Sequence, residues 1–313
     1  MARFVSFPYS HGDLESVLEL LSIWRVADPR HRLVAYPTTQ RLGLLLTSRL
    51  WTPERDAALW KDDTGQLVSF AALWSRSRDD DYRVLEGPFV HPGLSDAECG
   101  ALEATIVAWA RRQAEELSQE RSVPTTLSCM ARQDDTARRI AIERWGFRLH
   151  VAAGNVYFER DLNQLPGAPL PAGFSARGIH DEVELERYEA LYGFSAVDRA
   201  HRLALLRDPE YAHLVVVAPD DVFAAYCEVS ICRREWTAGS ARIGWIQYVG
   251  THDDYLRRGL GRAALLAGLA HLRAWGAERA MLITIPTNEP ANALYDATGF
   301  IRSAYEDVFV WRP

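Results

Sequence analysis

The chain has 313 residues, which is enough for two domains of ordinary size. Hydrophobic residues make up 48% of it, which excludes a disordered chain and suffices for two packed cores. The formal net charge of -7 argues against a nucleic-acid partner, because binding to phosphate backbones requires clustered Lys and Arg.

The four cysteines exclude a disulfide framework, because they are few for this length and none form a C-x-x-C pair. No spacing typical of a metal site is present, so we expect no metal. No apolar run reaches the roughly 18 residues of a membrane span, and residues 1–17 lack the apolar core of a secretion signal. We therefore expect a cytoplasmic protein with no membrane partner.

In the first half, hydrophobic periodicity and β-branched runs predict an alternation of strands and helices. The expected strands are 4–7, 57–60, 67–75, 84–90, 125–130 and 156–159, and the expected helices are 13–25, 40–48, 96–117 and 136–145. Residues 163–173 (NQLPGAPLPAG) follow, with three prolines and two glycines. Since proline lacks an amide donor and glycine adds entropy, we expect a linker there.

The second half repeats this order. The expected strands are 213–218, 222–232, 242–249, 280–285 and 307–311, and the expected helices are 180–192, 197–206, 260–275 and 288–298. Both halves end with a helix, a Gly-Phe pair and a strand, the pairs being Gly146-Phe147 and Gly299-Phe300. The matched order predicts a duplicated domain, with one copy in 1–162 and the other in 174–313.

The segment Ile246–Ala264 (IQYVGTHDDYLRRGLGRAA) predicts an anion site. A strand ends near Thr251, and after a short loop Gly259 and Gly261 open a helix. The first amides of a helix have no intrahelical acceptor and suit a phosphate, which glycine allows to approach closely. Three arginines add fork-shaped donors for phosphate oxygens: Arg257, Arg258 and Arg262. The plain alternative is a strand-to-helix turn with solvated arginines.

A dinucleotide site is a rival interpretation. The run 259–264 (GLGRAA) fits the fingerprint G-x-G-x-x-[G/A], and Glu278 lies about 20 residues further on. That fingerprint normally follows its strand directly, whereas about seven polar loop residues intervene here. It also opens a long series of βα units, for which the 52 residues after Gly261 are too few.

The segment 288–300 (NEPANALYDATGF) favours another family. Together with Gly259 and Gly261 at the helix start, this segment resembles the GNAT superfamily of acetyltransferases, and the resemblance covers about 175–313. The residues that carry the resemblance are Gly259, Gly261, Asn288, Ala291, Leu294-Tyr295 and Gly299-Phe300. Leu256 departs from the pattern, because the family usually has Arg or Gln there, so Arg257 or Arg258 would substitute as pyrophosphate donor.

The resemblance implies an α/β fold, of mixed α+β type, made of two tandem GNAT-like domains, each a mixed and mostly antiparallel twisted sheet flanked by helices. It implies acetyl-CoA as co-substrate, bound where the strand ending near Thr251 splays from the strand 280–285. Peptide groups of Val249, Gly250 and Thr251 would pair with the pantetheine arm. The implied pyrophosphate contacts are Arg257, Arg258, Gly259, Leu260, Gly261 and Arg262, and the implied contacts to the pantetheine arm or adenosine are Asn288 and Asn292.

The implied reaction is direct attack of a small-molecule primary amine on the thioester. Tyr295 stands where the family places the acid that assists the departing thiolate. Many relatives carry a base on the strand before the phosphate loop, but 242–249 has no Glu. Glu228, within the apolar run AAYCEVSI, is either exposed at an edge or the base. A water relay through His252, Asp253 or Asp254 stays open.

When the two halves are aligned by their Gly-Phe pairs, the first half lacks most of the residues that carry the resemblance. Asp96 and Glu98 fall at the phosphate-loop positions, where carboxylates repel a pyrophosphate. Ile142 falls opposite Tyr295. We therefore expect a degenerate N-terminal domain beside a catalytic C-terminal one, in a monomer or homodimer. Alternatives are a non-catalytic acyl-CoA sensor and acetylation of a protein N-terminus or lysine.

Overall fold

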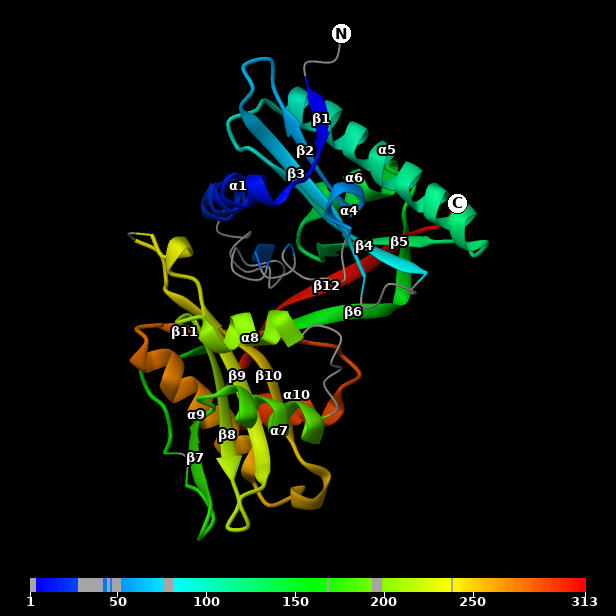
Figure 1. Ribbon diagram of the computed structural model, residues 1–313. Helices are drawn as coiled ribbons and strands as arrows, with labels where there is room; N and C mark the ends of the chain where they lie inside the picture. Colours follow the sequence, from blue (N-terminus) through cyan, green and yellow to red (C-terminus); the bar gives the residue numbers. More distant parts are fainter. Residues whose placement is uncertain are drawn as a thin grey trace. The chain divides into compact units, whose positions relative to one another are not determined.

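The computed structural model describes residues 4–27, 42–43, 46, 52–75, 81–167, 169–192, 199–237 and 239–313. Contacts divide the chain into two compact units. Unit 1 comprises Met1–Asn155 with Ala304–Pro313, and unit 2 comprises Val156–Ser303. Each contributes its own run of hydrogen-bonded strands, with helices on both faces of that run (Figure 1).

Unit 1 has the strand order β1-β2-β3-β4-β5-β12. All neighbours are antiparallel except β4 and β5, which are parallel. Its strands are β1 (Val5–Pro8), β2 (Ala57–Lys61), β3 (Leu67–Trp74), β4 (Tyr82–Val90), β5 (Thr126–Arg132) and β12 (Ile301–Trp311), and its helices include α1 (Leu14–Ala27), α4 (Pro53–Asp56), α5 (Asp96–Arg121) and α6 (Thr136–Arg144).

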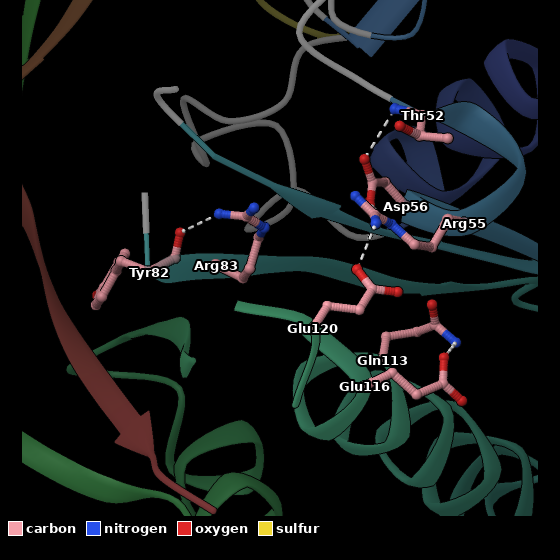
Figure 2. Close-up of polar contacts among 8 residues, drawn as sticks. All are labelled: Thr52, Arg55, Asp56, Tyr82, Arg83, Gln113, Glu116 and Glu120. Carbon is pink, nitrogen blue, oxygen red and sulfur yellow. Dashed lines mark hydrogen bonds and ion pairs between the residues drawn. The ribbon is translucent and has the colours of Figure 1, made fainter. Parts of the chain in front are cut away.

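The short helix α4 is fixed by polar contacts rather than by a hydrophobic face. The Asp56 carboxylate accepts from the Thr52 backbone N–H at 2.8 Å, which caps the start of the helix. Arg55 pairs with Glu120 near the end of α5 at 3.4 Å (Figure 2). In the same region the buried Arg83 donates to the Tyr82 carbonyl at 3.1 Å. The Arg55–Glu120 pair therefore joins α4 to α5.

Unit 2 has the strand order β6-β11-β10-β9-β8-β7, in which β10 and β11 are parallel and the other pairs are antiparallel. Its strands are β6 (Arg148–Asp161), β7 (Ser175–Gly178), β8 (Tyr211–Val217), β9 (Phe223–Ile231), β10 (Ile243–Thr251) and β11 (Arg279–Thr284), and its helices are α7 (Glu182–Tyr192), α8 (Arg199–Arg207), α9 (Leu260–Ala274) and α10 (Glu289–Ala297), with a short 3-10 turn, η4 (Asp253–Tyr255).

The alternation of side chains along β9 separates two cores in unit 2. Cys227 and Val229 face α9 and α10 within one apolar cluster, in which Leu265 and Leu269 of α9 are fully buried. Tyr226 on the opposite face packs with the cluster of α7 and α8. The two faces therefore present different chemistry to the middle of the sheet.

The last strands of the two sequence halves are exchanged. Residues Val156–Asp161 of β6 pair with β11 in unit 2, and Glu306–Trp311 of β12 pair with β5 in unit 1. The ranges 1–162 and 174–313 expected from the sequence repeat therefore differ from the compact units. A repeat is visible in sequence, whereas the partner of a strand is set by packing across the whole chain.

The mixed α/β fold confirms the expected fold class. The expected strands and helices recur with small shifts, except that β7 and α4 were not anticipated and that β6 and β12 both begin well before their expected starts. The expected helix 40–48 lies largely outside the described residues. Residues 163–167 and 169–173 contain neither helix nor strand. Within the described ranges, no helix combines the length and apolarity needed to cross a membrane.

Candidate active site

The strands β10 and β11 separate partway along their length. They pair at Ile243–Arg279, Gly244–Ala280 and Trp245–Met281, and no further pairing joins these two fully described strands. A bulge between Ile246 and Tyr248 breaks the register with β9 at the same level. Beyond Trp245 the backbone of β10 thus has a free edge toward β11, and this edge includes Val249, Gly250 and Thr251.

The helix α9 begins at the end of this free edge. Gly259 precedes it with φ 77° and no side-chain cap, so its first amides have no side-chain acceptor. A Cβ at Gly261 would lie 2.7 Å from Thr251 Oγ1, which means that glycine brings the helix start against the strand end. The Leu260 side chain is buried, so only its backbone is available there. These residues form a backbone cradle suited to an anion.

The three arginines around the cradle differ in their contacts. Arg258 donates to the Asp254 carbonyl at 3.1 Å and lies 5.1 Å from the Tyr255 ring, so it holds the loop together. Within the described part of the chain, Arg257 and Arg262 have neither a hydrogen bond nor an ion pair. Arg257 also has φ 60°, a left-handed conformation that side chains rarely adopt. Leu256 is 52% exposed and offers no donor.

The two asparagines predicted to contact acetyl-CoA lie at the start of α10. Asn288 is the N-cap, and its Oδ1 accepts from Ala291 N at 3.4 Å. Asn292 is 9% exposed, and its Nδ2 donates to the Pro286 carbonyl at 2.9 Å. Its Oδ1 is buried without a hydrogen-bond partner. An orphaned buried acceptor at this position suits an amide donor of a ligand.

Tyr295 projects from α10 into the core between Phe158 and Phe300, with ring centroids at 5.4 and 6.0 Å. It is 6% exposed, and among the described residues its hydroxyl has no hydrogen-bond partner. Burial, together with Cys227 and Tyr226, raises its pKa to about 12. The hydroxyl therefore stays protonated at neutral pH and is a donor without a partner.

Glu228 lies on the other face of β9 and is 1% exposed. Its Oε1 accepts from the Tyr188 hydroxyl at 2.6 Å and from Arg202 Nη2 at 3.3 Å, and its Oε2 accepts from the Tyr211 hydroxyl. Burial alone would raise its pKa, but the facing His213, Arg202 and these hydroxyls outweigh burial and lower the pKa. Each oxygen thus accepts a hydrogen bond from a tyrosine hydroxyl, and the carboxylate is shielded from solvent.

Aromatic rings connect this carboxylate to the free edge of β10, a feature that the sequence analysis missed. A Cβ at Gly250 would lie 2.4 Å from the Tyr226 ring, so the ring rests directly on this glycine. Tyr226 contacts Tyr188 and Tyr192 with centroids at 5.3 and 4.4 Å, and Tyr192 contacts His252 at 6.4 Å. The sequence feature that could have predicted this connection is the alternation of side chains, which places Tyr226 and Glu228 on one face of a strand.

The remaining candidates have structural contacts. His252 is the N-cap of η4, and its Nδ1 accepts from Asp254 N at 3.3 Å. Asp253 is exposed in the same turn. Among the described residues, no group of three or more His, Cys, Asp and Glu side chains is arranged to hold a metal ion.

Comparisons with known proteins agree with this geometry. Residues 179–300 match the family model described as "Acetyltransferase (GNAT) family". The mycothiol acetyltransferase of Salinispora tropica is 31% identical over 150 residues, which is 44% of this chain and 48% of that protein. The match thus spans about half the length of this relative.

Two solved structures share the fold along nearly the whole chain. A tandem GNAT protein from the clavulanic acid biosynthesis pathway is 18% identical, with a TM-score of 0.70 over 99% of this chain and 98% of its own. A GCN5-related N-acetyltransferase from Sphaerobacter thermophilus is 20% identical, with a TM-score of 0.65 over 100% and 96%. The dinucleotide interpretation loses support, because β10 is antiparallel to β9 and the sheet is not a run of parallel βα units.

Proposed function

Since residues 179–300 match the GNAT acetyltransferase family model, we propose that the chain transfers an acetyl group from acetyl-CoA to a primary amine of a small molecule. The observation that carries this proposal is the meeting of two features. The unpaired edge of β10 ends at Thr251, and the uncapped start of α9 lies against that residue. Acetyl-CoA has an extended pantetheine arm with amide groups, followed by a pyrophosphate. It therefore requires a strand edge followed by an anion site.

The residues present fit acetyl-CoA. The peptide groups of Val249, Gly250 and Thr251 offer a strand edge for the pantetheine arm, and the orphaned Oδ1 of Asn292 accepts from one of its amides. The amides after Gly259, with Arg257 and Arg262, hold the pyrophosphate. Nothing lies within 4 Å of a Cβ at Gly259, so the cradle is open on that side.

The proposed chemistry forms a C–N bond and breaks the C–S bond of the thioester. The acceptor must attack as a free amine, and an alkyl ammonium has a pKa of about 10.4, so it loses a proton before or during attack. Because both Glu228 oxygens are occupied, water near His252 is the proton acceptor that we propose.

Tyr295 stabilises the leaving group. Its hydroxyl is protonated, because burial and its neighbours raise the pKa to about 12, and it has no other hydrogen-bond partner in the described part of the chain. A thiol has a pKa of about 8.5, so full proton transfer to the thiolate is unfavourable. We propose that Tyr295 donates a hydrogen bond to the departing sulfur, which then leaves as a stabilised thiolate.

Binding is tested by thermal unfolding with and without excess acetyl-CoA. At 100 times the dissociation constant, a ligand stabilises the folded state by about 2.7 kcal/mol. We expect wild type to shift and Gly259→Glu not to shift, because the new carboxylate repels the pyrophosphate. Gly239→Glu is the matched control, since Gly239 has φ 81° and an equally open Cβ position. A shift retained by Gly259→Glu would place the ligand elsewhere.

Turnover is tested by thiol release from acetyl-CoA with a panel of primary amines. Tyr295→Phe removes one donor to developing negative charge, so we expect kcat to fall on the order of 100-fold. The affinity for acetyl-CoA, measured by calorimetry, should be unchanged, because the donor acts on the leaving group. An unchanged kcat would exclude Tyr295 from the chemistry.

A non-catalytic acyl-CoA sensor is the second candidate, favoured by the absence of a carboxylate from β10. Such a protein would bind acetyl-CoA but release no thiol with any small amine, peptide N-terminus or lysine peptide. The thiol-release panel therefore separates the sensor, the small-molecule enzyme and the protein-modifying enzyme.

A further inference from the structure

A buried polar network ties α7, α8 and β8 to β9 through one carboxylate. Glu228 accepts from Tyr188 of α7, Arg202 of α8 and Tyr211 of β8, and His213 Nε2 lies 3.9 Å from its Oε2. Glu228, Tyr188 and His213 are almost fully buried. Removing a group from such a network leaves the other partners unsatisfied, so the network fixes its members' positions tightly.

The network reaches the proposed site through Tyr188. The Tyr188 and Tyr226 rings are nearly perpendicular, at 82°, with centroids 5.3 Å apart, and Tyr192 at the end of α7 also packs against Tyr226. The Tyr192 hydroxyl donates to the Phe223 carbonyl at 2.5 Å, which fixes that ring as well. Tyr226 is thus held from one side by tyrosines and on the other rests on Gly250.

Gly250 belongs to the free edge of β10 that the proposed function assigns to the pantetheine arm. The Tyr226 ring covers the α7 and α8 side of this glycine, whereas Thr251 faces the start of α9. The phenol is therefore next to the end of the arm, on the face opposite Tyr295. Burial, Glu228 and Tyr248 raise the pKa of Tyr226 to about 12, so the group stays neutral.

We propose that Glu228 is a positioning residue, which through the Tyr188 hydroxyl holds the Tyr226 ring against Gly250 on the acceptor side of the thioester. Glu228 itself touches neither the acceptor nor the thioester. This inference rests on the proposed function for the identity of the thioester, but the placement of the ring is a claim about the protein alone.

The positional claim is tested without turnover. In protein labelled with ring-¹³C tyrosine, the Tyr226 signal is assigned by its absence from Tyr226→Phe. We expect this signal to move in Glu228→Gln and in Tyr188→Phe. Glu189→Gln is the matched control, because Glu189 is a buried carboxylate that pairs with Arg202 at 2.8 Å but accepts from neither Tyr188 nor Tyr211. A Tyr226 signal that stays fixed in Glu228→Gln, or moves equally in Glu189→Gln, overturns the proposal.

The kinetic claim is tested by thiol release from acetyl-CoA, with glucosamine, tyramine, lysine and spermidine as amines. Misplacing a group near the reacting atoms costs about 10- to 100-fold, so Glu228→Gln and Tyr188→Phe should each lower kcat by that factor. The KM for acetyl-CoA should be unchanged. Since both variants break one connection, the double variant should be no slower than either single variant.

Two kinetic outcomes contradict the proposal. A loss far above 100-fold in Glu228→Gln with a near-normal Tyr188→Phe would make Glu228 the direct base. A raised KM for acetyl-CoA with unchanged kcat would mean that the network acts on the binding of acetyl-CoA. If wild type releases no thiol with any amine, the proposed function fails, and the tyrosine signal still decides the positioning claim.

Discussion

The strand β4 of unit 1 and the strand β10 of unit 2 each pair with a parallel neighbour over their first three residues only. β4 (Tyr82–Val90) pairs with β5 only over Tyr82–Val84, and β10 (Ile243–Thr251) pairs with β11 only over Ile243–Trp245. Both strands also carry a bulge against their antiparallel neighbour just beyond that point. The opening between the two parallel strands is thus a property of the repeated fold, present whether or not the unit keeps the residues of the proposed chemistry.

The two units differ in what they place along the open edge. Pro88 occupies in β4 the place of Val249 in β10, and proline has no N–H to offer. Phe70 pairs with Phe89 in unit 1 as Tyr226 pairs with Gly250 in unit 2. The two phenylalanine rings stack at 6.4 Å and fill the space. Along this edge, unit 1 therefore has a proline without an N–H and an aromatic pair where unit 2 has Val249 and Gly250.

The helix that follows the edge differs in the same sense. α5 starts at Asp96, six residues after β4 ends at Val90, whereas α9 starts nine residues after Thr251. Ser95 and Glu98 form a capping box, in which the Glu98 carboxylate accepts from Ser95 N at 2.9 Å. Unit 1 thus stabilises its helix start with its own carboxylate, where unit 2 leaves amides for an external anion.

The first and largest prediction tests the strand exchange. Phe309 of β12 is fully buried in unit 1, although it belongs to the second half of the sequence. Removing such a ring costs about 3–5 kcal/mol. In Phe309→Ala we expect amide hydrogen exchange to rise in residues 81–155 and to change little in 211–284.

Phe158→Ala is the reciprocal variant, because Phe158 lies in β6 but is buried in the core of unit 2. It should give the opposite exchange pattern. If Phe309→Ala instead loosened 211–284, the compact units would follow the sequence halves.

The second prediction introduces a side chain of unit 1 at the equivalent position of unit 2. Gly250→Phe gives β10 the side chain that Phe89 provides in β4. A Cβ at Gly250 lies 2.4 Å from the Tyr226 ring, so we expect urea unfolding to show a loss of about 1–3 kcal/mol. Thiol release should be abolished. The double variant Gly250→Phe/Tyr226→Ala should regain stability without regaining turnover, and a stable, active single variant would contradict the assigned role of the open edge.

The third prediction uses a pair that only unit 2 has. His213 pairs with Glu228 across β8 and β9, where β2 and β3 have Ala57 and Ala72. Burial and Arg202 lower the pKa of His213, although Glu228 opposes them. The unfolded state, with a histidine pKa of about 6.5, therefore binds the proton first, and stability is greatest above this pH.

We accordingly expect the free energy of unfolding to fall below about pH 6.5, by at most about 1.4 kcal/mol per pH unit for this group. His213→Gln should flatten the curve between about pH 5 and 7. Burial also lowers the pKa of His271, so His271→Gln measures the contribution of His271 to the same slope. An unchanged slope in His213→Gln would show that His213 is not buried as a neutral ring.

The sequence alone determined much of the fold and the position of the backbone cradle. Periodicity located most strands and helices, and the two Gly-Phe pairs revealed the repeat, because Gly146 and Gly299 end their helices with φ 79° and 81°. The backbone cradle was also readable, since Gly259 and Gly261 are glycines for reasons local to one turn: a positive φ and a close approach to Thr251. Such local constraints act within a few residues and leave a mark in the sequence.

Only the tertiary structure decided which groups meet. Glu228 was a candidate base from its apolar neighbours in sequence, and the structure shows that its oxygens accept from Tyr188 and Tyr211, which lie 40 and 17 residues away in the chain. The exchange of β6 and β12 likewise depends on pairing between distant segments. A strand edge or a buried carboxylate takes its partner from whichever segment packs against it, and that choice is made by the whole chain, because buried polar groups must find partners wherever the packing provides them.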